Sequence, residues 1–259
     1  MPVRRSNRRD FIAALGGAAA WPLTASAQQS AMPRVGYVWI GALGTDPGYP
    51  GLRRGLEDRG YAVGRNLVLE ERYADGHTER LPALMAELLA LNIDVLASPG
   101  TQITRAAQRA TSTVPIVCVT GDPVGTGLVT SLAHPGGNIT GLSLLSGDYS
   151  AKWLELLKEA VPSLRVVAVL WNPDNPGLAG QLEHMREAAS PLGLELRGFS
   201  VRPADVEASF VAIGTASLDG LVLTDDPFVA TVIPRLLALP PSVACPRSTR
   251  LATPSSKAG

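Results

Sequence analysis

The chain has 259 residues, of which 46% are hydrophobic and 18% are charged, and its formal net charge is zero. This length and composition are ample for a hydrophobic core in one or two domains. The sequence has no basic stripe and no acidic tail, so it gives no support for binding to nucleic acid.

Residues 1–27 have the features of an export signal. A basic start precedes a mild apolar stretch, and Ala25-Ser26-Ala27 matches an A-x-A cleavage site. The stretch is too short and too rich in Gly and Ala to span a bilayer. Arg8-Arg9-Asp10-Phe11 resembles the twin-arginine pattern, although Asn7 stands where Ser or Thr is usual. We expect cleavage after Ala27 and a periplasmic protein, exported by the twin-arginine or the general secretion route.

From Arg34 on, strand and helix patterns alternate. The periodicity predicts strands over 34–40, 66–75, 93–99 and 114–120, and helices over 51–60, 78–91 and 101–111, with Thr78 as an N-cap. A further helix is expected over 123–133, with Pro123 in its first turn. Alternation of this kind indicates a parallel sheet covered by helices on both faces.

A second series repeats this rhythm. Strands are predicted over 165–171, 194–201 and 218–224, and helices over 149–160, 177–192 and 204–216. Each series opens with Arg-Val-x-x-Val, at Arg34 and at Arg165, and closes with Thr-x-Asp-Pro, at Thr120 and at Thr224. We expect two doubly wound α/β lobes, over 33–143 and 144–239, with their closing strands in equivalent places.

The predicted strand ends are rich in Gly, Pro, Ser, Thr, Asn and Asp. Ligands of open parallel sheets bind beyond the carboxyl ends of the strands. Asp122, Asp225 and Asp226 could pair with an ammonium group, and Trp39 and Trp171 offer flat apolar surface. The alternative is that these residues only cap helices and shape turns. Taken as a set, they favour a small-molecule site.

Several enzymatic signatures are absent from the sequence. It contains no P-loop, no dinucleotide-binding fingerprint and no nucleophile elbow. The histidines are scattered, and Cys118 and Cys245 lack metal-ligand spacing. Cys118 is expected to be a buried thiol in its strand. We therefore expect no enzyme, no cofactor and no metal.

Several stretches resemble the bacterial ABC-transporter substrate-binding protein family, whose members include tryptophan- and tyrosine-binding lipoproteins. The most specific is "DPVGTGLVTSLAHPGGNITG", and "RVGYVW", "KWLELLKEAVPSLRVVAVLWNPDNP" and "DGLVLTDDPFV" also match. The resemblance implies a type I periplasmic-binding-protein fold. It further implies a monomer that binds a small organic solute, such as an aromatic amino acid or a related compound, and docks on an inner-membrane permease. The ligand residues that it implies are Ile40, Gly41, Ser98, Gly100, Thr101, Thr120, Asp122, Pro123, Trp171, Asn172, Thr224 and Asp225.

Two other functions remain open at this point. The same fold could present its ligand to a signalling partner as a sensor, or the chain could be an exported α/β enzyme. Ligand binding without turnover would separate a receptor from an enzyme, and a neighbouring permease gene would separate a receptor from a sensor.

The tail from Leu237 to Gly259 lacks the strand–helix rhythm and is rich in Pro, Ser, Thr and Arg. Relatives continue here with segments that complete the lobes. We interpret the tail, residues 240–259, as the product of a reading-frame shift after Leu239, and the alternative is a genuine divergent terminus. We expect an incomplete second lobe with exposed apolar surface, and impaired solute binding.

Overall fold

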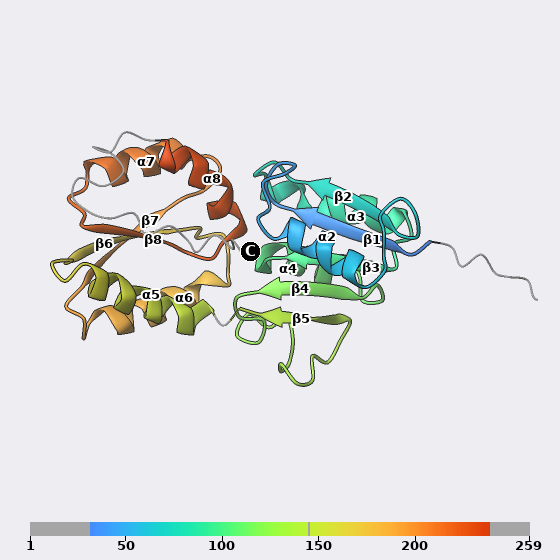
Figure 1. The fold of residues 1–259 in the computed structure, drawn as a ribbon, viewed down its shortest axis with the longest axis horizontal. Helices are drawn as coiled ribbons and strands as arrows, with labels where there is room; N and C mark the ends of the chain where they lie inside the picture. Colours follow the sequence, from blue (N-terminus) through green and yellow to red (C-terminus); the bar gives the residue numbers. More distant parts are fainter. Residues whose placement is uncertain (1–31, 145, 239–259) are drawn as a thin grey trace, which may run out of the picture. The chain divides into compact units, whose positions relative to one another are not determined.

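The computed structural model describes residues 32–144 and 146–238. The predicted export signal and the tail 240–259 lie outside these residues, as does Cys245. The described residues form two parallel sheets with helices packed on them (Figure 1). The first sheet has the strand order β2-β1-β3-β4-β5 and the second has the order β7-β6-β8.

The elements follow the predicted alternation. In chain order they are β1 (Arg34–Trp39), α2 (Tyr49–Asp58), β2 (Val68–Tyr73), the 3-10 helix η1 (Thr78–Arg80), α3 (Leu81–Ala90), β3 (Val95–Pro99), α4 (Thr101–Ala110), β4 (Ile116–Thr120), β5 (Ile139–Ser143), α5 (Ser146–Ala160), β6 (Val166–Trp171), α6 (Leu178–Ala189), β7 (Glu195–Ser200), α7 (Val206–Thr215), β8 (Gly220–Leu223) and α8 (Pro227–Leu237).

The second sheet is buried on both faces. Successive side chains of a strand point to opposite faces, and β6 shows this clearly. Val167 and Val169 pack in a cluster with residues of α5 and α6, whereas Ala168 and Leu170 pack in a cluster with residues of α7 and α8. Figure 1 shows these two helix pairs on opposite sides of the sheet. The continuous apolar run of β6 is therefore typical of a strand covered on both sides.

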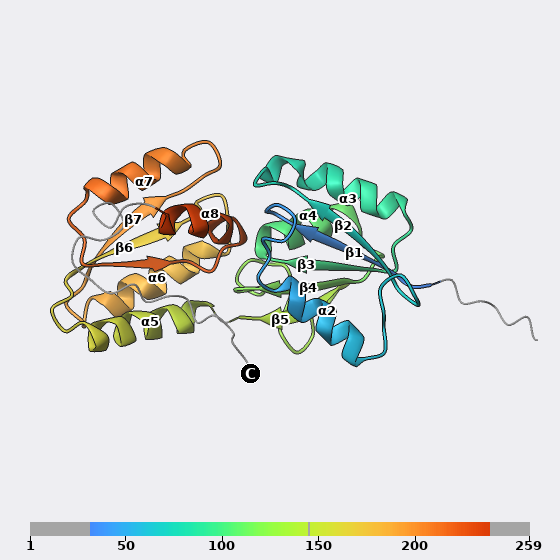
Figure 2. The same ribbon diagram turned by 45° about the horizontal axis from the view of Figure 1, so that its top comes forward.

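The first sheet is covered less evenly. On one face, Gly36 lets Leu88 of α3 approach, since an added Cβ would lie 3.3 Å from its side chain. Figure 2 shows α3 and α4 on that side and α2 on the other. On the α2 side, Val117 and Val119 of β4 remain 44% and 37% exposed. The helical cover of this face thus stops short of β4 among the described residues.

The two sheets share a structural repeat at the start of their first strands. The Asp94 carboxylate accepts the N–H of Arg34 at 2.7 Å. The Asp219 carboxylate accepts the N–H groups of Arg165 and Val166, each at 3.0 Å. Each aspartate directly precedes a strand that pairs with the first one, β3 in the first sheet and β8 in the second.

This repeat corrects one expectation. Because β8 pairs with β6 as β3 pairs with β1, β8 is the counterpart of β3. The Thr-x-Asp-Pro ends of β4 and β8 are therefore not in equivalent places. The counterpart of the turn 224–227 is the turn that follows β3.

The predicted helix over 123–133 is wrong. The segment is a series of turns, in which the Pro123 carbonyl accepts the N–H groups of Leu128 and Val129. Gly127 has φ +69°, a left-handed conformation that ends helical propagation. Thr78 is also not an N-cap: it begins η1, whose capping residue is His77. Strand β5 and helix α8 were not anticipated from the sequence.

The described chain from Pro33 on belongs to one compact unit. The division into two lobes at residue 143 therefore remains a proposal, although it coincides with the end of β5 at Ser143. None of the described helices is long and apolar enough to cross a membrane.

Candidate ligand-binding site

A pocket of about 450 Å³ lies beyond the carboxyl ends of strands β1, β3 and β4 and beside the residues that follow β8. This is where parallel sheets generally bind ligands, and the volume is typical of a small-molecule site. The lining residues are Tyr37, Trp39, Asp46, Pro47, Gly48, Leu52, Ala97, Ser98, Pro99, Gly100, Thr101, Val117, Val119, Thr120, Gly121, Leu144, Asn175, Asp225, Asp226, Pro227 and Ala230.

The loop after β1 is held in place by two aromatic side chains of that strand. The Tyr37 hydroxyl donates to the Asp46 carboxylate, and the Trp39 indole N–H donates to the Thr45 hydroxyl at 2.8 Å. The second Asp46 oxygen accepts the N–H of Gly48 at 2.7 Å. Burial and the hydrogen bond to Asp46 raise the pKa of Tyr37, so its phenol stays protonated. Asp46 is therefore fixed at the pocket wall.

The turn between β3 and α4 brings backbone close to the start of α8. Gly100 has φ +106°, and an added Cβ would lie 2.5 Å from Cγ of Pro227. Ser98 and Thr104 are buried and share a hydrogen bond of 3.0 Å. Only a glycine permits both this conformation and this approach, so Gly100 shapes the pocket through its backbone.

Asp226 is the most deeply buried acid of the pocket, with 3% exposure. It caps α8 by accepting the N–H of Val229 at 2.8 Å, and it accepts the Asn175 side-chain amide at 2.7 Å. Burial raises its pKa in spite of these donors. Its hydrogen bonds make it a structural part of the wall, since they fix the start of α8 against the loop after β6.

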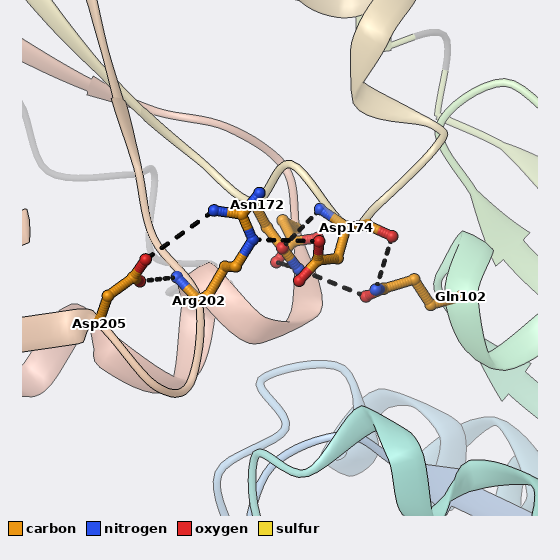
Figure 3. A network of polar contacts seen from close by, with 6 residues as sticks. Gln102, Asn172, Asp174, Arg202 and Asp205 are labelled. Carbon is orange, nitrogen blue, oxygen red and sulfur yellow. Dashed lines mark hydrogen bonds and ion pairs between the residues drawn. The ribbon is translucent and has the colours of Figure 1, made fainter.

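A polar network connects α4 with the loop after β6 (Figure 3). The Gln102 amide donates to the Asp174 carbonyl at 3.0 Å. Asn172 donates to Asp226 at 3.4 Å, and its own oxygen accepts the Asp174 N–H at 3.0 Å. Arg202 extends the network to the Asp174 carboxylate at 3.2 Å. The elements around the pocket are therefore joined by hydrogen bonds of side-chain amides and by the ion pair between Arg202 and Asp174.

The site residues expected from the sequence divide into two groups. Those that line the pocket are Ser98, Gly100, Thr101, Thr120 and Asp225. Those that do not are Ile40, Gly41, Asp122, Pro123, Trp171, Asn172 and Thr224. The assignment of ligand contacts remains a prediction for both groups, and the structure places the first group together.

The second group has structural contacts instead. Ile40 is fully buried, and Gly41 lies close to Thr231 of α8, with an added Cβ 2.6 Å away. Thr224 donates to the Leu170 carbonyl at 3.0 Å. Trp171 packs in the cluster beneath α5 and α6. These residues support the site without lining it.

Asp122 does not line the pocket, although it is one of the ligand residues expected from the resemblance. Its carboxylate accepts the N–H of Gly125 at 2.8 Å and so closes the turn that it begins. The first-sheet acid that lines the pocket is Asp46. The signal for Asp46 was present in the sequence, since it lies in the Gly- and Pro-rich loop directly after β1.

A larger hollow of about 910 Å³ lies over α3 and α4, where Arg105 and Arg109 line it. None of the site residues expected from the sequence lines this hollow. The pocket at the strand ends is therefore the better candidate. Among the described residues, no group of histidines, cysteines and acids could hold a metal ion.

The described residues thus form a two-sheet α/β fold with a pocket of small-molecule size beyond its strand ends. The model of the family "ABC transporter substrate binding protein" matches residues 38–244. The chain belongs to this family, which groups it with binding proteins and not with enzymes. A curated relative, the tyrosine-binding protein of Clostridioides difficile, is 28% identical over 198 residues, which are 72% of this chain and 56% of the relative.

Two solved structures show the same fold. A conserved domain protein from Vibrio cholerae is 31% identical, with a TM-score of 0.71, and the match covers 78% of this chain and 68% of that protein. An ABC domain from Streptococcus pneumonia, solved in complex with L-Trp, is 22% identical, with a TM-score of 0.69 and the same coverage. Of the tyrosine-binding relative described above, the chain spans little more than half the length.

Proposed function

We propose that this chain is the solute-binding component of an ABC import system. It is exported to the periplasm, where it binds a small organic solute between two lobes, residues 33–143 and 144–239. It then delivers the solute to an inner-membrane permease. The binding needs no cofactor.

The pocket carries this proposal. The turns after β1, β3 and β4 line it together with the start of α8, so residues from both predicted lobes line one pocket. A ligand held there would connect the two sheets. This geometry suits a receptor that closes on its solute.

An aromatic amino acid is the solute that we propose. Tyr37, Trp39 and Val117 provide apolar walls, and the start of α4 borders the pocket at Gly100 and Thr101. The tyrosine-binding relative and the L-Trp complex of the pneumococcal protein support the same class of solute.

A thermal-shift screen of the purified chain against the common amino acids tests the proposal. A ligand at about 100 times its Kd stabilises a folded protein by about 2.7 kcal/mol, so the melting temperature should rise by several degrees with tyrosine or tryptophan. The ligand should be recovered unchanged. If no amino acid shifts the melt, the proposal is wrong.

A matched pair of variants places the binding in the pocket. Ala97 lines the pocket, whereas Ala212 is exposed on α7. Ala97→Leu should remove the ligand-induced shift because the larger side chain occupies the ligand's volume. Ala212→Leu should keep the shift.

A further inference from the structure

Gln102 lies in the first turn of α4, outside the pocket at the strand ends. It lines the hollow over α3 and α4 instead. Helix α4 belongs to the first predicted lobe, and Figure 3 shows the Gln102 side chain directed at the loop after β6, in the second. The Gln102 amide donates to the Asp174 carbonyl at 3.0 Å, and the Asn172 amide donates to the Gln102 oxygen at 3.5 Å. Gln102 therefore joins the two predicted lobes without lining the solute pocket.

The loop that receives Gln102 is held in one conformation by its own hydrogen bonds. Asn172 is 1% exposed, and its oxygen accepts the Asp174 N–H at 3.0 Å. The Asp174 carboxylate pairs with Arg202 at 3.2 Å. The Asn175 amide donates to Asp226 at 2.7 Å. The Asp174 carbonyl is thus a preorganised acceptor, so little entropy is lost in the loop when Gln102 donates to it.

The backbone directly before Gln102 also packs against the second predicted lobe. An added Cβ on Gly100 would lie 2.5 Å from Cγ of Pro227, and one on Gly177 would lie 2.7 Å from Oγ1 of Thr101. We call this contact of the first turn of α4 with the second predicted lobe the closed arrangement. A hydrogen bond is lost once its donor and acceptor separate by more than about 3.5 Å. The bonds of Gln102 therefore exist only in the closed arrangement.

The chemistry of these bonds suits a contact that forms and breaks repeatedly. The Gln102 side chain is partly exposed and carries no charge. When the predicted lobes separate, water can hydrogen-bond to its amide and to the Asp174 carbonyl, so no buried polar group loses its partner. The net gain from an exposed hydrogen bond is small. Gln102 can therefore favour the closed arrangement without making it irreversible.

We propose that Gln102 is a positioning residue that stabilises the closed arrangement through Asp174 and Asn172 and thereby slows the release of the solute. The effect on release rests on the proposed function, whereas the effect on closure does not depend on which solute binds. Gln102 acts through the ratio of open to closed molecules, which multiplies the intrinsic affinity of the pocket.

Distances between the two predicted lobes test closure in the absence of any ligand. Spin labels are attached at Asp58→Cys on α2 and Ala212→Cys on α7, both exposed positions. Cys245→Ser removes the second native cysteine, and Cys118 is buried. Double electron–electron resonance on the purified chain then gives the distribution of distances. Gln102→Leu, which keeps the size of the side chain, should raise the ratio of open to closed molecules about fivefold.

A matched control lies on the same helix. The Gln108 amide donates to the Leu128 carbonyl at 3.3 Å, within the first predicted lobe. Gln108→Leu removes a hydrogen bond of the same kind and should leave the distances unchanged. Gln102→Lys should keep the wild-type distances, because its ammonium group still donates to the Asp174 carbonyl.

Three results of the distance measurement overturn the inference. They are an unchanged distribution in Gln102→Leu, an equal change in Gln108→Leu, and a Gln102→Lys variant as open as Gln102→Leu. Circular dichroism melts establish that each variant is folded.

Stopped-flow measurements with tyrosine test the release of the solute. The dissociation rate should rise about fivefold in Gln102→Leu and stay at the wild-type value in Gln108→Leu and Gln102→Lys. If tyrosine leaves Gln102→Leu as slowly as the wild type, the role in release is wrong. If the wild type binds no tyrosine, the proposed solute fails, and the distances alone decide the role of Gln102 in closure.

Discussion

Single residues with unusual backbone conformations fix the turns around the pocket. Gly100 combines φ +106° with the approach to Pro227, and both exclude a side chain. Gly100→Ala should lower the free energy of unfolding by about 2 kcal/mol or more, because it adds backbone strain and a steric clash. Chemical denaturation measures this change.

The matched control is a helical glycine with space around it. Gly180 lies in α6, and an added Cβ would meet nothing within 4 Å. Gly180→Ala should stabilise the protein by about 0.5–1 kcal/mol, since alanine favours the helix. Equal effects of the two substitutions would contradict the role assigned to Gly100.

The free energy of unfolding is expected to depend on pH through Asp219, which lies at the start of the second sheet. Two backbone N–H groups, from Val166 and Arg165, lower its pKa below the ordinary value of 3.8. Because the folded pKa is the lower one, the stabilisation is fully present above about pH 3.8 and is lost as the pH falls through the folded value. Asp219→Ala should therefore be destabilising at pH 7, and the difference from the wild type should shrink at low pH.

Urea unfolding of the wild type and Asp219→Ala at several pH values measures this difference. Asp219→Asn serves as the control, because it keeps an acceptor oxygen without a titrating group. A difference between wild type and Asp219→Ala that stays constant between pH 7 and pH 2 would show that charge plays no part.

The edge of the first sheet, at strands β4 and β5, leaves apolar side chains in contact with solvent. Leu142 of β5 is 68% exposed and pairs in register with Val119 of β4. Residues in register point to the same face, so the two side chains form one apolar surface with Val117. Leu142→Ser should change the free energy of unfolding by less than about 0.5 kcal/mol and reduce both dye binding and aggregation.

The same strand provides the control for this surface. Ile139 is 4% exposed, and Ile139→Ala should cost about 2–4 kcal/mol because it leaves a cavity. A large loss of stability in Leu142→Ser would show that Leu142 is covered in solution.

The expected twin-arginine route of export depends on Arg8 and Arg9. Replacing both with lysine keeps the charge of the segment but removes the twin-arginine pair. We expect the amount of exported protein in the periplasm to fall sharply, as measured by cell fractionation and immunoblotting. Unchanged periplasmic levels would indicate the general secretion route.

The alternation of strands and helices followed from the sequence because side-chain periodicity is a local property. The apolar run of β6 and the repeated Arg-Val starts predicted two parallel sheets, and the resemblance predicted the family. Five of the expected ligand residues, among them Ser98, Thr120 and Asp225, line the pocket because the strand ends that carry them were recognised correctly.

Only the tertiary structure decided which strand ends correspond and which acids line the pocket. Strand pairing shows that β8 is the counterpart of β3, a relation that the Thr-x-Asp-Pro motif at Thr120 and Thr224 concealed. The Asp122 carboxylate closes its own turn by accepting the Gly125 N–H. Asp46 lines the pocket because the Tyr37 hydroxyl donates to its carboxylate and holds it there. The strand pairing depends on contacts between segments distant in the chain, and the positions of the two aspartates depend on the hydrogen bonds of single turns. The periodicity of the side chains carries no information about either.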